Sequence, residues 1–150
     1  MSKHHSIGRL TSHITHITHL YLTTQLQHYH ISSGQLPLLM RLYHQDGIHQ
    51  EQLAHDLLLD KTTCTRQITK LVKAGLITKE NDPTDKRANK IYLTDKAHRI
   101  KKDVRHILRT WRNILLQNFT PEDQNQFLTY LQRTIENAQT YLNDLNQTEL

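Results

Sequence analysis

Residues 47–94 contain two short helical patterns followed by two alternating segments, and this order restricts the possible folds more than any other feature of the chain. The first helical pattern places Leu53, Ala54 and Leu57 on one side, and the small Ala54 suits a close helix crossing. A turn is predicted at residues 58–59. The segment therefore begins with a short helix and a tight turn.

A second helix is predicted between Asp60, a suitable N-cap, and Gly75, a suitable C-terminal stop. Its two faces differ in chemistry, since one is apolar and the other carries hydroxyls and cations. The apolar face comprises Cys64, Ile68, Leu71 and Val72, and the polar face comprises Thr62, Arg66, Thr69 and Lys73. This pattern is typical of a helix-turn-helix whose second helix enters a major groove. The hydroxyls and the helix N-terminus suit phosphates, and Arg66 can reach a guanine edge.

Two alternating segments, 76–79 and 90–93, follow the second helix. Turn-forming residues are concentrated between them, at 81–85, so a β-hairpin is predicted. Its tip carries Lys86 and Arg87. A helix-turn-helix followed by such a hairpin is a winged helix, and an arginine on the wing suits the narrow, electronegative minor groove.

The positive charge of the chain is concentrated in this central part. Residues 61–105 contain thirteen Lys and Arg against five Asp and Glu, whereas the rest of the chain contains six against nine. Such a block is expected of a protein that binds a polyanion, although a solvated lysine-rich face would look the same.

The two ends of the chain carry apolar positions at spacings of three and four residues, as in a coiled-coil seam. The first seam is Ile7, Leu10, Ile14, Ile17 and Tyr21, and the second is Leu128, Leu131, Ile135, Ala138, Leu142 and Leu145. Thr120 and Pro121 mark the start of the second helix. A homodimer interface built from both ends is the favoured interpretation, and internal packing of both seams is the alternative.

Histidine recurs at every third position in SHITHITHL, residues 12–20. A three-residue repeat drifts around a helix, so these histidines do not converge, although His13 and His16 are neighbours at i, i+3. A zinc site would need further ligands from elsewhere in the chain, and no spacing identifies them. Zinc binding is the alternative interpretation of these histidines. We expect no cofactor and no enzymatic activity, because motifs of catalytic and nucleotide-binding sites are absent.

Cys64 is the one cysteine of the chain, so no internal disulfide can form. Together with the lack of a signal-peptide pattern at the start, this favours a cytoplasmic protein. No apolar run approaches the roughly 18 residues of a membrane span, and no membrane partner is expected. On the inner face of the second helix, Cys64 is expected to be a small buried apolar residue; oxidant sensing is the alternative.

The span 47–97 resembles the MarR family of transcription regulators. The similarity lies in QLAHDLLLDKTTCTRQITKLVKAGLI and in DPTDKRANKIYLTDKA, where Asp85, Arg87, Ile91, Leu93 and Thr94 match the wing pattern. The resemblance implies a mainly helical fold with a small β-hairpin wing. We expect a winged helix-turn-helix lobe at 31–94 and a helical dimerisation region made from 1–30 and 95–150.

The resemblance also implies a homodimer that binds double-stranded DNA at a pseudo-palindromic operator, commonly as a repressor that a small anionic aromatic effector releases. A zinc-responsive regulator of the same fold, with histidine ligands, is the alternative function. Asp85 would orient Arg87 through an ion pair. An effector site would lie where the lobe meets the dimer helices, near His13, His16, Met40 and Tyr43. The expected DNA contacts are Thr62, Thr63, Thr65, Arg66, Thr69, Lys70, Lys73, Lys86 and Arg87.

Overall fold

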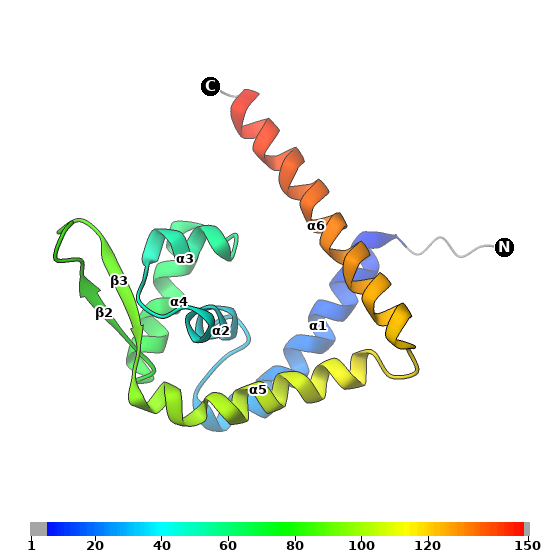
Figure 1. Ribbon diagram of the computed structural model, residues 1–150, viewed down its shortest axis with the longest axis horizontal. Coiled ribbons are helices and arrows are strands. Elements are labelled where there is room, and N and C mark those ends of the chain that lie inside the picture. Colours follow the sequence, from blue (N-terminus) through cyan, green and yellow to red (C-terminus); the bar gives the residue numbers. More distant parts are fainter. Residues whose placement is uncertain (1–5, 149–150) are drawn as a thin grey trace. The chain divides into compact units, whose positions relative to one another are not determined.

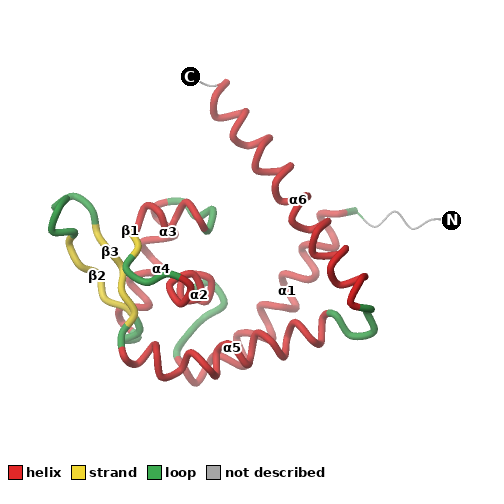
Figure 2. The backbone as a smooth tube through the Cα atoms, in the orientation of Figure 1, coloured by secondary structure: helices red, strands yellow, loops and turns green. Residues whose placement is uncertain are grey.

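The structure, a computed structural model, describes residues 6–148 and is mainly helical (Figures 1 and 2). In chain order its elements are α1 (Ile7–Leu26), the 3-10 helix η1 (Gln27–Tyr29), α2 (Leu36–His44), β1 (Ile48–His49), α3 (Gln50–Asp56), α4 (Lys61–Lys73), β2 (Ile77–Asn81), β3 (Asn89–Leu93), α5 (Asp95–Leu115) and α6 (Pro121–Thr148). The predicted fold class, a helical protein with a small winged β-element, is confirmed. The two ends of the expected dimerisation region, residues 1–5 and 149–150, lie outside the described residues.

The wing belongs to a three-stranded antiparallel sheet in the order β1-β3-β2 (Figure 2). The hairpin β2–β3 was predicted, and its register pairs Ile77 with Leu93 and Asn81 with Asn89. Strand β1 was not predicted. It contains two residues, and Ile48 pairs with Ile91 of β3. A two-residue strand is too short to show an alternating pattern, so its pairing is visible only in three dimensions.

The predicted helix limits of the helix-turn-helix are confirmed. The Asp60 carboxylate accepts a hydrogen bond from the Thr63 backbone N–H at 2.7 Å, which caps α4. Helix α4 ends at Lys73, and Gly75 follows with a φ of +74°, a conformation that favours glycine. Thr120 caps α6 in the same way, because its hydroxyl accepts from the Asp123 N–H at 3.1 Å.

The core side of α4 differs from the prediction at one position. Cys64, Ile68 and Leu71 are buried as expected, but Val72 is 43% exposed and Gln67 is buried in its place. Positions 64, 67, 68 and 71 form the stripe i, i+3, i+4, i+7 that faces the core, and Val72 lies at its edge. The helix therefore buries one polar side chain that the apolar pattern could not indicate.

The structure divides into two compact units, and the boundary lies within α5, between Arg109 and Thr110. The core of the first unit includes residues from α1, namely Leu22 and Leu26, and from α5, namely Ala97 and Val104. Parts of the two segments assigned to the dimerisation region thus also complete the core of the lobe. No helix among residues 6–148 is long and apolar enough to cross a membrane.

The apolar seams of α1 and α6 remain exposed in the single chain. On α1, Ile7, Leu10, Ile14 and Ile17 are exposed, and only Leu22 and Leu26 near its C-terminal end are buried. On α6 the exposed positions are Leu128, Leu131, Ile135, Leu142 and Leu145. Exposed apolar stripes of this length are typical of protein–protein contacts.

Candidate nucleic-acid interface

The outward face of α4 presents cations to solvent. Arg66, Lys70 and Lys73 are exposed, and none of them forms an ion pair with another described residue. Thr62, one turn before Arg66, is also exposed. Because these cations lack acidic neighbours in contact, their charge is available to a polyanionic partner.

Three threonine hydroxyls of α4 already have protein partners. The Thr63 hydroxyl donates to the Asp60 carboxylate at 2.7 Å, and the Thr69 hydroxyl donates to the Thr65 carbonyl oxygen at 2.9 Å. The Thr65 hydroxyl accepts from the Gln50 side-chain amide at 2.9 Å. These bonds hold α4 and its start in place, and Thr65 and Thr69 remain exposed.

The wing tip lies between β2 and β3 and carries the exposed Lys86 and Arg87. The Asp85 carboxylate accepts a hydrogen bond from the Arg87 backbone N–H at 3.0 Å, and the Asp85 carbonyl oxygen accepts from Ala88 N–H at 3.0 Å. Among the ion pairs of residues 6–148, none joins Asp85 to the Arg87 guanidinium. Asp85 therefore shapes the turn through the backbone, and the Arg87 side chain is left exposed.

Asp82, at the base of the wing, is a residue that sequence reasoning missed. It is 5% exposed, and its carboxylate accepts hydrogen bonds from the Thr84 N–H at 3.0 Å and hydroxyl at 2.8 Å. His49 Nε2 also contacts it at 2.6 Å, and Lys90 Nζ lies 3.9 Å away. The Thr84 backbone hydrogen bond, the His49 contact and the nearby Lys90 charge lower the pKa of Asp82 far below its usual range. The Asp-Pro step at 82–83 was a turn signal, but it could not reveal the partner on β1.

A hollow of about 900 Å³ separates the wing from the start of α3 and α4. His49 and Thr65 line it on one side, and Lys79, Asp85 and Arg87 line it on the other. The first turns of α4 and the wing residue Arg87 therefore border one concave surface.

Comparison with known proteins agrees with this geometry. Residues 31–88 match the model of the MarR family. The HTH-type transcriptional regulator YybA of Bacillus subtilis is 31% identical over 109 residues, which are 73% of this chain and 73% of YybA. The chain belongs to the MarR family. It is therefore a winged-helix transcription regulator.

Solved MarR-family structures have the same fold. A MarR transcriptional regulator from Methanosarcina mazei Go1 superimposes with a TM-score of 0.84 at 34% identity, over 90% of this chain and 97% of the other. The S. aureus MepR chain, solved in a complex with DNA, has a TM-score of 0.80 at 22% identity, over 91% of this chain and 99% of MepR. At that identity the MepR comparison concerns the fold alone.

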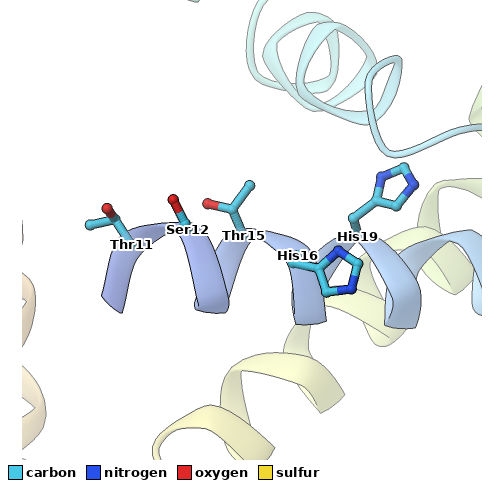
Figure 3. A pocket seen from close by; sticks show the side chains of 5 residues that line it. All are labelled: Thr11, Ser12, Thr15, His16 and His19. Atoms are coloured by element: carbon cyan, nitrogen blue, oxygen red, sulfur yellow. The ribbon is translucent and has the colours of Figure 1, made fainter. Parts of the chain in front are cut away.

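One groove of this MarR-family chain contains one of the effector-site candidates. A shallow groove of about 480 Å³ runs along α1, lined by Thr11, Ser12, Thr15, His16 and His19, and Figure 3 shows that all five side chains come from this one helix. His19 is hydrogen-bonded to the Ser33 hydroxyl.

Of the expected effector-site residues, His16 alone lines this groove. His13 is exposed, and Met40 is half-buried against the core. Tyr43 is buried, and its hydroxyl donates to the Ala97 carbonyl oxygen. Burial raises the pKa of Tyr43 to about 12. Tyr43 is thus part of the lobe core.

Cys64 is buried, as expected, with 1% of its surface exposed. Burial raises the pKa of its thiol, and the nearby Asp60 carboxylate acts in the same direction. Across residues 6–148, no group of three or more His, Cys, Asp or Glu side chains is arranged to hold a metal ion.

Proposed function

We propose that the chain is a homodimeric repressor that binds a pseudo-palindromic DNA operator, with α4 in the major groove and the wing in the minor groove. The observation that carries this proposal is that the start of α4 and the wing residue Arg87 line one hollow, while the cations of α4 and of the wing tip are exposed. A recognition helix and a wing on one surface can engage adjacent grooves of the same duplex.

The chemistry of each side chain suggests its role in this complex. Arg66 lies on the outward face of α4, where a guanidinium can pair with the O6 and N7 atoms of guanine. Arg87 would enter the minor groove. The remaining positions, Thr62, Thr63, Thr65, Thr69, Lys70, Lys73 and Lys86, would contact phosphates, and Lys61 at the exposed start of α4 joins them. Thr63, Thr65 and Thr69 would act from hydroxyls that the protein has already oriented.

The exposed seams of α1 and α6 support the homodimer. A single chain leaves these apolar positions in water, whereas a symmetric pair would cover the same surface on both copies. Two copies related by a two-fold axis would present two α4 helices, which is the arrangement that a pseudo-palindromic operator requires.

The experiment is binding-site selection on random duplex DNA, followed by affinity measurement on the selected sequence by fluorescence anisotropy. We expect the Arg87→Ala variant to bind more weakly at unchanged melting temperature, because Arg87 is exposed and no side-chain contact would be lost. Arg99→Ala, which removes an exposed arginine from α5, is the matched control. Unaltered affinity of both Arg87→Ala and Arg66→Ala would refute this docking, as would failure of the unmodified chain to bind DNA at low salt.

We also propose that a small anionic aromatic effector binds the α1 groove and releases the DNA. The ring nitrogens of His16 and His19 would supply hydrogen bonds to a carboxylate, beside the hydroxyls of the same groove. Release requires that the effector prefer a conformation in which the two α4 helices no longer match the grooves. A thermal-shift screen with phenolic carboxylates, and with zinc as a comparison, tests this step. We expect a phenolic carboxylate to stabilise the unmodified chain but not His16→Ala, and to weaken operator binding. Stabilisation by zinc alone would contradict the proposal.

A further inference from the structure

Two consecutive residues at the junction of β1 and α3 connect the wing to the recognition helix. His49 Nε2 lies 2.6 Å from the Asp82 carboxylate at the base of the wing. Gln50 donates through its side-chain amide to the Thr65 hydroxyl on α4 at 2.9 Å. These two side chains and their two contacts form the His49–Gln50 bridge.

The wing end of the bridge contacts the residue at which the loop leaves the sheet. Asp82 is the first residue after β2, and its backbone N–H donates to the Ala88 carbonyl oxygen at 3.0 Å, which closes the loop that carries Arg87. Its carboxylate is buried and also binds Thr84. Because these bonds orient Asp82 within the loop, the His49 contact attaches the whole loop to β1 and not merely one side chain.

The helix end of the bridge contacts α4 on its exposed side. Thr65 is adjacent to Arg66 in the chain and lies within the same outward surface. The Gln50 side chain is half-buried, and its carbonyl oxygen is buried without a hydrogen-bond partner among the described residues. A buried amide oxygen without a partner carries a free-energy cost, and the hydrogen bond that the Gln50 amide N–H donates to the Thr65 hydroxyl holds this side chain against α4.

We propose that the His49–Gln50 bridge is a positioning element that sets the separation between the wing and α4, so that Arg87 and Arg66 meet their grooves together. This rests on the proposed DNA docking. The groove separation of a duplex is fixed, so two reading elements that are held at the matching separation lose less conformational freedom on binding. His49 and Gln50 would therefore contribute to affinity by holding other residues in place.

A double-mutant cycle between His49 and Arg87 tests the proposal. His49→Ala removes the contact with Asp82, and we expect operator affinity to fall roughly tenfold, the size of coupling found within one contact network. His49→Gln retains a side-chain N–H donor toward Asp82 and should recover most of that affinity. In an Arg87→Ala background, His49→Ala should have little further effect, because the group that it positions is already gone. His44→Ala, at an exposed histidine of α2, is the matched control.

A second double-mutant cycle, Gln50→Ala with Arg66→Ala, tests the helix end of the bridge. We expect Gln50→Ala to lower operator affinity in the unmodified chain but not in the Arg66→Ala background. Equal affinity of His49→Ala and the unmodified chain would overturn the proposal, as would a His49 effect that adds in full to that of Arg87→Ala.

Hydrogen exchange of the free protein provides a readout that needs no DNA. His49→Ala should speed exchange at the amides of Asp82 and Ala88, and leave the amides of α2 at their original rates. Unchanged exchange at 82–88 would overturn the bridge even if the variant bound DNA poorly. A different result would be that His49→Ala speeds exchange at the wing amides while the unmodified chain binds no DNA. The proposed function would then fail. The bridge would be a structural contact only, and its positioning role would be overturned as well.

Discussion

Gly47 and Gly75 both have a positive φ, +68° and +74°, but their surroundings differ. A Cβ added at Gly75 would meet nothing closer than the Lys96 side chain at 3.8 Å, so Gly75→Ala tests the backbone cost alone. We expect it to lower the free energy of unfolding by about 1–2 kcal/mol. A Cβ at Gly47 would lie 2.8 Å from the Tyr92 ring, so Gly47→Ala should cost more. Urea unfolding of both variants measures the difference, and equal losses would contradict the predicted overlap with Tyr92.

The environment of Asp82 predicts how the stability of the chain changes at low pH. Its pKa is held below the ordinary value of 3.8 in the folded chain, so the folded state favours the carboxylate. The resulting stabilisation is complete well above the unfolded pKa and is lost as the pH falls below it, from about pH 5 toward pH 2. The melting temperature of Asp82→Asn should therefore fall less steeply than that of the unmodified chain over this range. Glu51→Gln, an exposed carboxyl of α3, controls for the lost charge; parallel curves for Asp82→Asn and the unmodified chain would exclude this role.

Single residues could be predicted where the signal is local. The cap at Asp60, the stop at Gly75 and the burial of Cys64 depend on neighbours within one or two turns, so the sequence alone indicated them. The contact between His49 and Asp82 joins residues that are 33 positions apart, and no local pattern reports such a pair. No local pattern indicated the burial of Gln67 either, because its side chain is polar.

Substitutions of two cations of α4, Arg66 and Lys73, should weaken DNA binding in different ways. Arg66→Ala should cost roughly 1–3 kcal/mol on the selected operator and relax the preference at one base position, if Arg66 reads a base edge. Lys73→Ala should weaken binding to all sequences alike and reduce the slope of log K against log salt concentration by about 0.9, the value for one phosphate contact. Anisotropy titrations at several salt concentrations, on operator and on scrambled DNA, distinguish the two. Identical behaviour of both variants on the two DNAs would contradict the assigned roles.

At the scale of elements, length determined what could be predicted. The hairpin strands β2 and β3 contain five residues each, although along β2 only Ile77 is buried, whereas β1 contains two residues and shows no pattern. The long helices α1 and α6 were predicted from their repeated apolar positions. That pattern identified a contact face but not its partner, because an apolar seam has the same spacing whether it packs within one chain or against a second copy.

For the whole molecule, the helix-turn-helix and wing motifs sufficed to indicate the MarR family, since their residues are contiguous. The effector site stays a prediction, because no contiguous motif marks it. Its candidates were chosen from separate helices, and the structure places Tyr43 in the core and His16 in a groove on α1. A site assembled from distant segments depends on their packing, which residue spacing does not encode.

Leu131 and Leu142 lie on the exposed seam of α6, and a symmetric interface would bury both on each copy. Leu131→Asp with Leu142→Asp would then place four carboxylates in an apolar contact, where uncompensated charges are costly, so the double variant should be monomeric. Light scattering after size exclusion gives the mass. Thr129→Asp with Thr140→Asp is the matched control, because both threonines lie on the opposite face of α6 and each donates its hydroxyl to the carbonyl four residues earlier. The control should remain dimeric and retain DNA binding, whereas the monomeric variant should bind a single half-site weakly. A dimer that survives both aspartates would exclude the α6 seam as the interface.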